Sequence, residues 1–126
     1  MLVIIDDDAV AGESLSDVFS ELYPVRFFQS PTEALKFIET EPFFPQVCIV
    51  DYRMPEMSGA FVARRIKQLN RDLQVIMISG FVDFEDVQEL LKQRDVDEFH
   101  RKPLDVQALK KSVEFRRKLF LKRSAI

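Results

Sequence analysis

The sequence contains a single cysteine, Cys48, so the 126-residue chain cannot form an internal disulfide. This thiol lies in an apolar run and is interpreted as a small core residue, which suits the reducing cytoplasm. Membrane-length hydrophobic runs are lacking, and the first apolar stretch, Leu2–Ile5, meets acidic residues too soon to be a signal peptide. Internal repeats, low-complexity tracts and linkers are also absent. These absences predict a soluble cytoplasmic protein with no membrane span.

Charge and size limit the partners of the chain. With 47% hydrophobic and 31% charged residues, the sequence fits one compact domain, residues 1–126, and leaves no room for a second. A net charge of -3 argues against direct binding to nucleic acid. From Glu114 onward five cations accompany one carboxylate, so this end carries +4 and the remainder of the chain -7. We therefore expect an acidic domain with a basic final segment.

A continuous apolar run, Val47–Val50, leads directly into Asp51 near the middle of the chain. A run without polar alternation predicts a parallel strand covered on both faces. Ligands of such sheets bind beyond the carboxyl ends of the strands. Pro55 disfavours a helix through the residue before it, and the next helix is expected from about Ser58. Asp51 is therefore predicted to lie at the binding edge of a parallel sheet, in front of a loop.

Short apolar segments alternate with helical patterns along the rest of the chain. Strands are expected at Leu2–Ile5, Val25–Phe28, the run ending at Asp51, Leu73–Ile78 and Val96–Arg101. Helices are expected over an apolar stripe formed by Ala11, Leu15, Val18, Phe19 and Leu22, from the Ser30 cap to about Glu41, from about Ser58, from about Asp83, and after the Asp105 cap. Five strands alternating with five helices predict an α/β fold with a parallel sheet and helices on both faces.

Polar residues follow four of the predicted strands: Asp6 and Asp7, Asp51, Ser79, and Lys102. Parallel strands bring their carboxyl ends to one edge, so these residues should converge. Neighbouring carboxylates repel one another, and a hard cation such as Mg²⁺ would relieve that repulsion while leaving positions for phosphate oxygens. Asp51 could then attack a phosphoryl group to form an aspartyl phosphate, with Lys102 balancing the charge. Each feature alone is an ordinary turn or solvated face, and the combination carries the interpretation.

Four motifs resemble a response-regulator receiver domain of two-component signalling, similar to the chemotaxis receiver, over essentially the whole chain. They are Ile-Ile-Asp-Asp-Asp at 4–8, Val-Asp-Tyr-Arg-Met-Pro-Glu-Met-Ser-Gly at 50–59, Met-Ile-Ser-Gly at 77–80 and Phe-His-Arg-Lys-Pro at 99–103. The resemblance implies a flavodoxin-like, doubly wound five-stranded sheet in the order 2-1-3-4-5, with a cis Lys102–Pro103 bond. It also implies a phosphorylation-dependent switch that catalyses only its own phosphorylation and dephosphorylation.

The resemblance implies a role for each residue of the site. Asp51 would be the phosphoacceptor, Lys102 would pair with the phosphoryl group, and Ser79 and Phe99 would be the switch residues. The Mg²⁺ ligands would be Asp6, Asp7, Asp51 and the backbone carbonyl of Arg53. The family often has Thr and Tyr at the two switch positions, so Ser79 and Phe99 are conservative variants. The surface formed by the fourth helix, fifth strand and fifth helix would change on phosphorylation.

The implied partners are a sensor histidine kinase or phosphotransfer protein and an output domain or downstream protein, with homodimer formation on phosphorylation. The single His100 is assigned a structural or surface role. Arg53 and Phe81 flank the acceptor in the family pattern, and we expect them to shield the phosphoryl group from water and prolong its lifetime.

Two other functions remain open from the residues alone. Asp6-Asp7-Asp8-Ala9-Val10 fits the Asp-x-Asp-x-(Thr/Val) signature of haloacid-dehalogenase-type phosphatases, in which Asp6 would be the nucleophile and Asp8 a general acid. A pseudo-receiver, which would bind partners without phosphorylation, is disfavoured by the intact acids and lysine.

Overall fold

The structure, a computed structural model, describes residues 1–41, 45–80 and 84–124. The strands are β1 (Leu2–Ile5), β2 (Val25–Phe28), β3 (Val47–Asp51), β4 (Gln74–Ser79) and β5 (Glu98–Arg101). The helices are α1 (Ala9–Ser20), α2 (Pro31–Thr40), α3 (Gly59–Leu69), α4 (Phe84–Lys92) and α5 (Val106–Ser124). All ten predicted elements are present, and β4 and β5 begin one and two residues later than predicted. Phe81 and Asp83, both named in the sequence predictions, lie outside the described residues.

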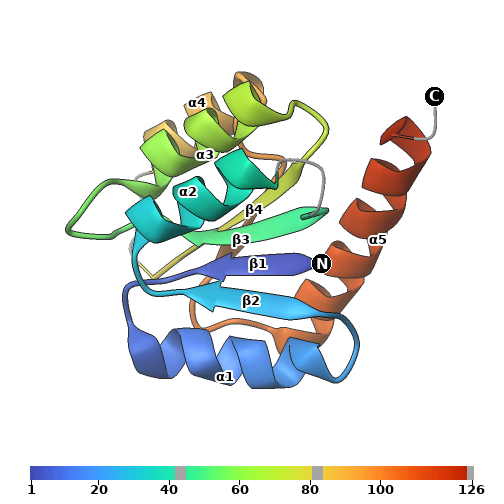
Figure 1. Ribbon diagram of the computed structural model, residues 1–126. Helices are drawn as coiled ribbons and strands as arrows, with labels where there is room; N and C mark the ends of the chain where they lie inside the picture. The colour runs from blue at the N-terminus through green and yellow to red at the C-terminus, as the bar shows by residue number, and fades with distance from the viewer. Residues whose placement is uncertain (42–44, 81–83, 125–126) are drawn as a thin grey trace.

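The five strands form one parallel sheet in the order β2-β1-β3-β4-β5, which confirms the predicted topology. Figure 1 shows α2, α3 and α4 on one side of the sheet and α1 on the other. The strand side chains alternate between these two faces. Ile4, Ile49 and Ile78 pack with α1 and α5, whereas Ile5 and Val50 pack with the helices of the opposite face. Because both faces are covered, the central strands are apolar apart from Gln74, Ser79 and Asp51 at their ends, as predicted.

The helices begin at polar caps that the sequence indicates. Asp8, Ser30 and Ser58 each accept a hydrogen bond from a backbone N–H in the first turn of α1, α2 and α3, respectively. In α1 the predicted apolar stripe is correct for Leu15 and Phe19, which are buried. The prediction is wrong for Leu22, which is 54% exposed, because α1 ends at Ser20 and the stripe does not continue past it.

The longest described helix is α5, whose last turn carries Lys122 and Arg123. Leu109 and Val113 on this helix are buried against the sheet. None of the helices in the described part of the chain combines the length and the apolar composition needed to cross a membrane.

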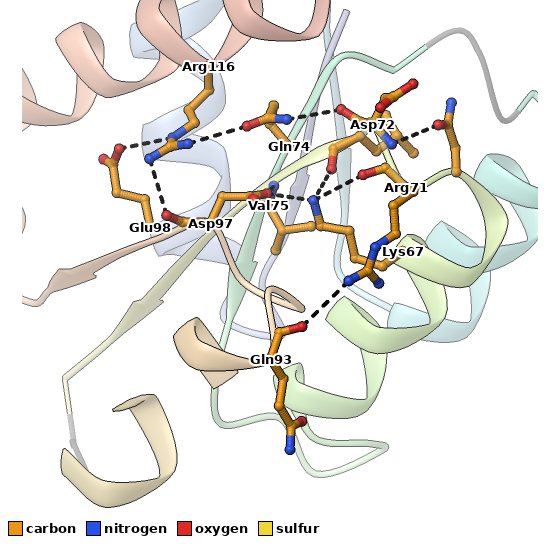
Figure 2. Close-up of polar contacts among 11 residues, drawn as sticks. Lys67, Arg71, Asp72, Gln74, Val75, Gln93, Asp97, Glu98 and Arg116 are labelled. Carbon is orange, nitrogen blue, oxygen red and sulfur yellow. Dashed lines mark hydrogen bonds and ion pairs between the residues drawn. The ribbon is translucent and has the colours of Figure 1, made fainter. Parts of the chain in front are cut away.

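A network of polar groups, several of them buried or half-buried, lies near the amino ends of β4 and β5 (Figure 2). Asp51, the last residue of β3, lies at the opposite edge of the parallel sheet. The centre of the network is Lys67 of α3, whose side chain is only 3% exposed and whose Nζ lies 2.7 Å from the Asp97 carboxylate. The same Nζ donates to the carbonyl of Leu73 at 2.6 Å, and Asp97 accepts from the backbone N–H of Val75 at 2.8 Å. On the α5 side, Arg116 bonds to the Glu98 carboxylate at 3.1 Å. The network therefore joins α3, β4, β5 and α5 by hydrogen bonds.

Candidate functional site

The structure brings three acids and one lysine together at the carboxyl edge of the sheet. Asp6 and Asp7 follow β1, and Asp51 is the last residue of β3. One carboxylate oxygen from each of these acids lies within 4.8 Å of the other two, so the cluster could hold a metal ion. Lys102 follows β5, and its Nζ lies 3.5 Å from Asp6 Oδ2 and 3.6 Å from Asp51 Oδ1. Four residues of the predicted site therefore lie close together at this edge of the sheet.

Asp6 is the most deeply buried of these acids, with no exposed surface. Its Oδ1 accepts a hydrogen bond from the backbone N–H of Asp8 at 3.0 Å. Its Oδ2 is buried and has no hydrogen-bond partner among the described residues, although Lys102 lies at 3.5 Å. A buried carboxylate oxygen without a hydrogen bond is costly unless a cation compensates it. This orphaned oxygen and the all-carboxylate donor set fit a hard divalent cation such as Mg²⁺.

The backbone around Asp51 is held on both sides. The N–H of Tyr52 donates to the carbonyl of Ile78 at 2.9 Å, and the N–H of Gly59 donates to the carbonyl of Tyr52 at 2.8 Å. A side chain at Gly59 would collide with the Asp51 carbonyl oxygen and would place a Cβ 2.7 Å from the Tyr52 Cα. Glycine is thus required where α3 begins, because the backbone of α3 approaches the backbone at the end of β3.

Lys102 is placed by the pairing of β4 with β5. Ser79 pairs with Arg101 in the parallel register, and the N–H of Lys102 donates to the Ser79 carbonyl at 2.9 Å. The Lys102–Pro103 peptide bond is cis, as the family resemblance implies. The lysine side chain is about one-third exposed, at 30%, and so it reaches the acids from the solvent side.

Burial and neighbouring charge change the acid strength of Asp51. Burial, followed by the charge of Asp6, raises the pKa of Asp51 from 3.8 to about 7, and Lys102 opposes this shift. In the metal-free protein near neutral pH, the Asp51 carboxyl group therefore carries a proton part of the time. Because only the ionised carboxylate is a good nucleophile or metal ligand, cation binding and proton loss should be coupled at this residue.

This shift predicts how metal-free stability depends on pH. Between about pH 4 and pH 7 the folded protein keeps a proton on Asp51 that the unfolded chain has lost, so the free energy of unfolding falls as the pH rises. We expect Asp51→Asn to raise the free energy of unfolding at pH 8 by on the order of 2 kcal/mol. At pH 4 the parent and the variant should have nearly equal free energies of unfolding. Urea denaturation in a chelator at both pH values measures this difference. An equal effect at both pH values would contradict it.

The two predicted switch residues lie on neighbouring strands. Ser79, at the end of β4, is 2% exposed, and it is adjacent to Ile78, which pairs with Asp51. Phe99 of β5 is half-buried and packs against the core from the edge of the sheet. It also lines a cavity of about 530 Å³ between α4 and β5. The side chain of His100 is held by Glu98 at 2.6 Å and Ser112 at 3.0 Å, in agreement with a structural role.

Asp8 does not join the acid cluster. It is exposed, and its carboxylate accepts hydrogen bonds from the N–H groups of Val10 and Ala11 at 3.0 and 3.3 Å. It is therefore occupied as the cap of α1, which removes the second acid that the phosphatase alternative requires.

Contacts of the loop after Asp51 were not predicted from the sequence. Glu56 bonds to Ser30 and Thr32 at the start of α2, and the Tyr52 hydroxyl donates to Asp86 of α4 at 3.0 Å. These partners lie between 24 and 34 positions apart in the chain, and no local spacing pattern points to them. In the sequence, these contacts are indicated only by the presence of polar residues in a loop that borders the predicted site.

Residues 2–114 match the family described as response regulator receiver domain. The chain is 34% identical over 104 residues to the response regulator protein TodT of Pseudomonas putida, covering 82% of this chain and 44% of TodT. It is 28% identical over 113 residues to the hydrogenase transcriptional regulatory protein HoxA of Bradyrhizobium diazoefficiens, covering 90% of this chain and 23% of HoxA. The chain thus spans less than half of either relative.

Solved structures share the fold. A CheY-like response regulator receiver domain protein from Methanospirillum hungatei aligns with a TM-score of 0.88 at 23% identity, over 97% of this chain and 96% of that one. At this identity the likeness concerns the fold alone. Together with the family match, it supports the receiver resemblance and gives no support to the phosphatase alternative.

Proposed function

The chain belongs to the response regulator receiver domain family, and we propose that it accepts a phosphoryl group on Asp51. A receiver domain of two-component signalling is a regulatory switch, so the chemistry concerns the domain itself rather than a released product. The observation that carries the assignment is the position of Asp51 at a strand end, within reach of Asp6, Asp7 and Lys102.

In this proposal a carboxylate oxygen of Asp51 attacks the phosphorus of a donor as the donor bond breaks. The donor leaves with the electron pair of the broken bond: acetyl phosphate leaves as acetate, and a phosphohistidine protonated on its other ring nitrogen leaves as neutral histidine. Lys102 lies 3.6 Å from the Asp51 carboxylate, close enough to pair with a phosphoryl oxygen. Asp6, Asp7, Asp51 and the backbone carbonyl of Arg53 would hold Mg²⁺. When bound, Mg²⁺ would neutralise charge on the phosphoryl oxygens.

The proposal is tested by intact-mass analysis after incubation with acetyl phosphate and Mg²⁺. One added phosphoryl group, dependent on Mg²⁺, is expected. A protein that binds Mg²⁺ yet gains no phosphoryl group from acetyl phosphate, phosphoramidate or a histidine-kinase donor would contradict the assignment.

We propose that Ser79 and Phe99 couple phosphorylation of the site to a conformational change at the surface of the domain. Ser79 is buried at the end of β4, next to Ile78, which pairs with Asp51. Phe99 lines the cavity between α4 and β5, so a phosphoryl group that attracts the Ser79 hydroxyl could change the packing around Phe99. Moving such a switch from 1:99 to 99:1 needs about 5.5 kcal/mol of differential interaction.

We predict that Ser79→Ala keeps phosphorylation but weakens the response. Loss of one hydrogen bond to a charged group, about 2 kcal/mol, should lower the active-to-inactive ratio by about thirtyfold. NMR spectra with and without beryllofluoride measure the change at Phe99 and in α4. Ser20→Ala, at the exposed end of α1, is the matched control and should respond like the parent protein. Equal spectral changes in both variants would contradict a role for Ser79.

The partners follow from the same proposal. A histidine kinase or phosphotransfer protein would supply the phosphoryl group, and an output domain or separate protein would bind the surface of α4, β5 and α5.

A further inference from the structure

The loop between β3 and α3 is attached to another helix through Glu56. Glu56 Oε2 accepts a hydrogen bond from Ser30 Oγ at 3.2 Å, and Oε1 accepts one from Thr32 Oγ1. Ser30 is the cap residue of α2, and Thr32 lies in the first turn of the same helix. One carboxylate thus bridges two segments that are 24 residues or more apart in the chain.

The start of α2 is a rigid support for this carboxylate. Ser30 is the helix cap, and its Oγ also accepts a hydrogen bond from the N–H of Glu33 at 3.2 Å. Pro31, at the first helical position, is buried and has a fixed φ. The N-terminal end of a helix also attracts negatively charged groups, so a carboxylate is a suitable partner at this position.

The position of Glu56 in the chain connects this support to the site. Asp51 lies five residues before Glu56, and Arg53, whose carbonyl is proposed to bind the metal, lies three residues before it. Met54 is buried, with 7% of its surface exposed. Pro55, which lies between Met54 and Glu56, restricts the backbone there because its φ is fixed. Fixing Glu56 therefore restricts the directions in which the peptide group of Arg53 can point.

We propose that Glu56 is a positioning residue for metal binding and phosphoryl acceptance. By bonding to Ser30 and Thr32, it holds the loop so that the Arg53 carbonyl faces the cluster of Asp6, Asp7 and Asp51. This inference rests on the proposed function, and it adds a residue that does not itself touch the metal or the phosphoryl group.

The first measurement is Mg²⁺ affinity, by calorimetry, of the parent and the variants. Glu56→Ala should raise the Kd by about tenfold, the lower end of what the loss of a residue that orients a metal ligand costs. Thr32→Val should have a similar effect, and the double variant should bind no more weakly than Glu56→Ala alone, because both changes break the same contact.

Conservative variants separate position from charge. Glu56→Gln keeps an acceptor oxygen and Thr32→Ser keeps the hydroxyl, so both should bind Mg²⁺ within about twofold of the parent protein. The matched control is Glu33→Ala, which removes a carboxylate from the same turn of α2. The Glu33 side chain makes no hydrogen bond or ion pair within the described ranges. This control should retain the parent Kd.

Two further readouts distinguish positioning from general stability. In metal-free Glu56→Ala, amide hydrogen exchange should become faster in residues 52–58 and remain unchanged in β1 and β4. At limiting Mg²⁺, phosphorylation by acetyl phosphate should slow in this variant, and saturating Mg²⁺ should restore the parent rate.

A parent-like Kd for Glu56→Ala would overturn the inference. A Gln variant as weak as the Ala variant would also overturn it, because the charge and not the hydrogen bonds would then matter. A parent protein that binds no Mg²⁺ and takes up no phosphoryl group would instead contradict the proposed function.

Discussion

Asp51→Asn should abolish covalent phosphorylation. An amide oxygen is a poor nucleophile, and no other carboxylate in the described cluster ends a strand beside Lys102 as Asp51 does. We expect the initial rate of phosphoryl incorporation from acetyl phosphate with Mg²⁺ to fall by at least about a hundredfold. Quantitative intact-mass analysis, followed by peptide mapping of the parent adduct after borohydride trapping, measures both rate and position.

Asp8→Asn is the matched control for this experiment. Asn caps a helix as well as Asp does, so α1 should be preserved, and Asp8 is the residue that a phosphatase mechanism would need as an acid. This variant should take up the phosphoryl group at the parent rate. Equal incorporation by Asp51→Asn and the parent, or loss of incorporation in Asp8→Asn alone, would contradict the role of Asp51.

The order of the elements could be predicted because each one carries a local signal. The apolar run before Asp51 predicts a strand and the capping pattern at Ser30 predicts a helix, each from fewer than ten residues. The structure has β3 and α2 at these positions. The strand order was given by the family resemblance, since local patterns do not determine which strands are neighbours. The meeting of Asp6, Asp51 and Lys102 then follows from parallel strands sharing one edge.

Properties that arise only from tertiary packing could not be predicted. The repulsion between Asp6 and Asp51 could be expected from their converging strand ends, but the depth at which Asp51 is buried, which is the larger cause of its raised pKa, depends on packing and has no sequence signature. The contact between Glu56 and Thr32 depends on how a loop meets a distant helix. The burial of Lys67 contradicts the general preference of lysine for the surface. Its position four residues after Ala63, on the buried stripe of α3, is the one signal that could have indicated it.

This buried lysine gives the largest expected effect on stability. Lys67→Met keeps the apolar stem but leaves the Asp97 carboxylate, 14% exposed, without the cation that lies 2.7 Å from it. It also removes the donor to the Leu73 carbonyl. Breaking one side of a buried pair costs about 3 kcal/mol or more. We therefore expect the free energy of unfolding to fall by about 3 kcal/mol and the Tm by roughly 10 °C.

A matched exposed pair separates burial from charge. Lys118 lies 3.0 Å from Glu114 on α5, but these side chains are 67% and 55% exposed, so Lys118→Met should cost less than about 0.5 kcal/mol. Adding Asp97→Asn to Lys67→Met should recover part of the loss, because Asn removes the unpaired charge and still accepts from Val75. Urea denaturation of the four proteins measures these differences. Since Lys67 lies away from the acid cluster, phosphorylation of the folded Lys67→Met variant should match that of the parent. Equal losses for Lys67→Met and Lys118→Met would show that the buried pair contributes no more than a surface pair.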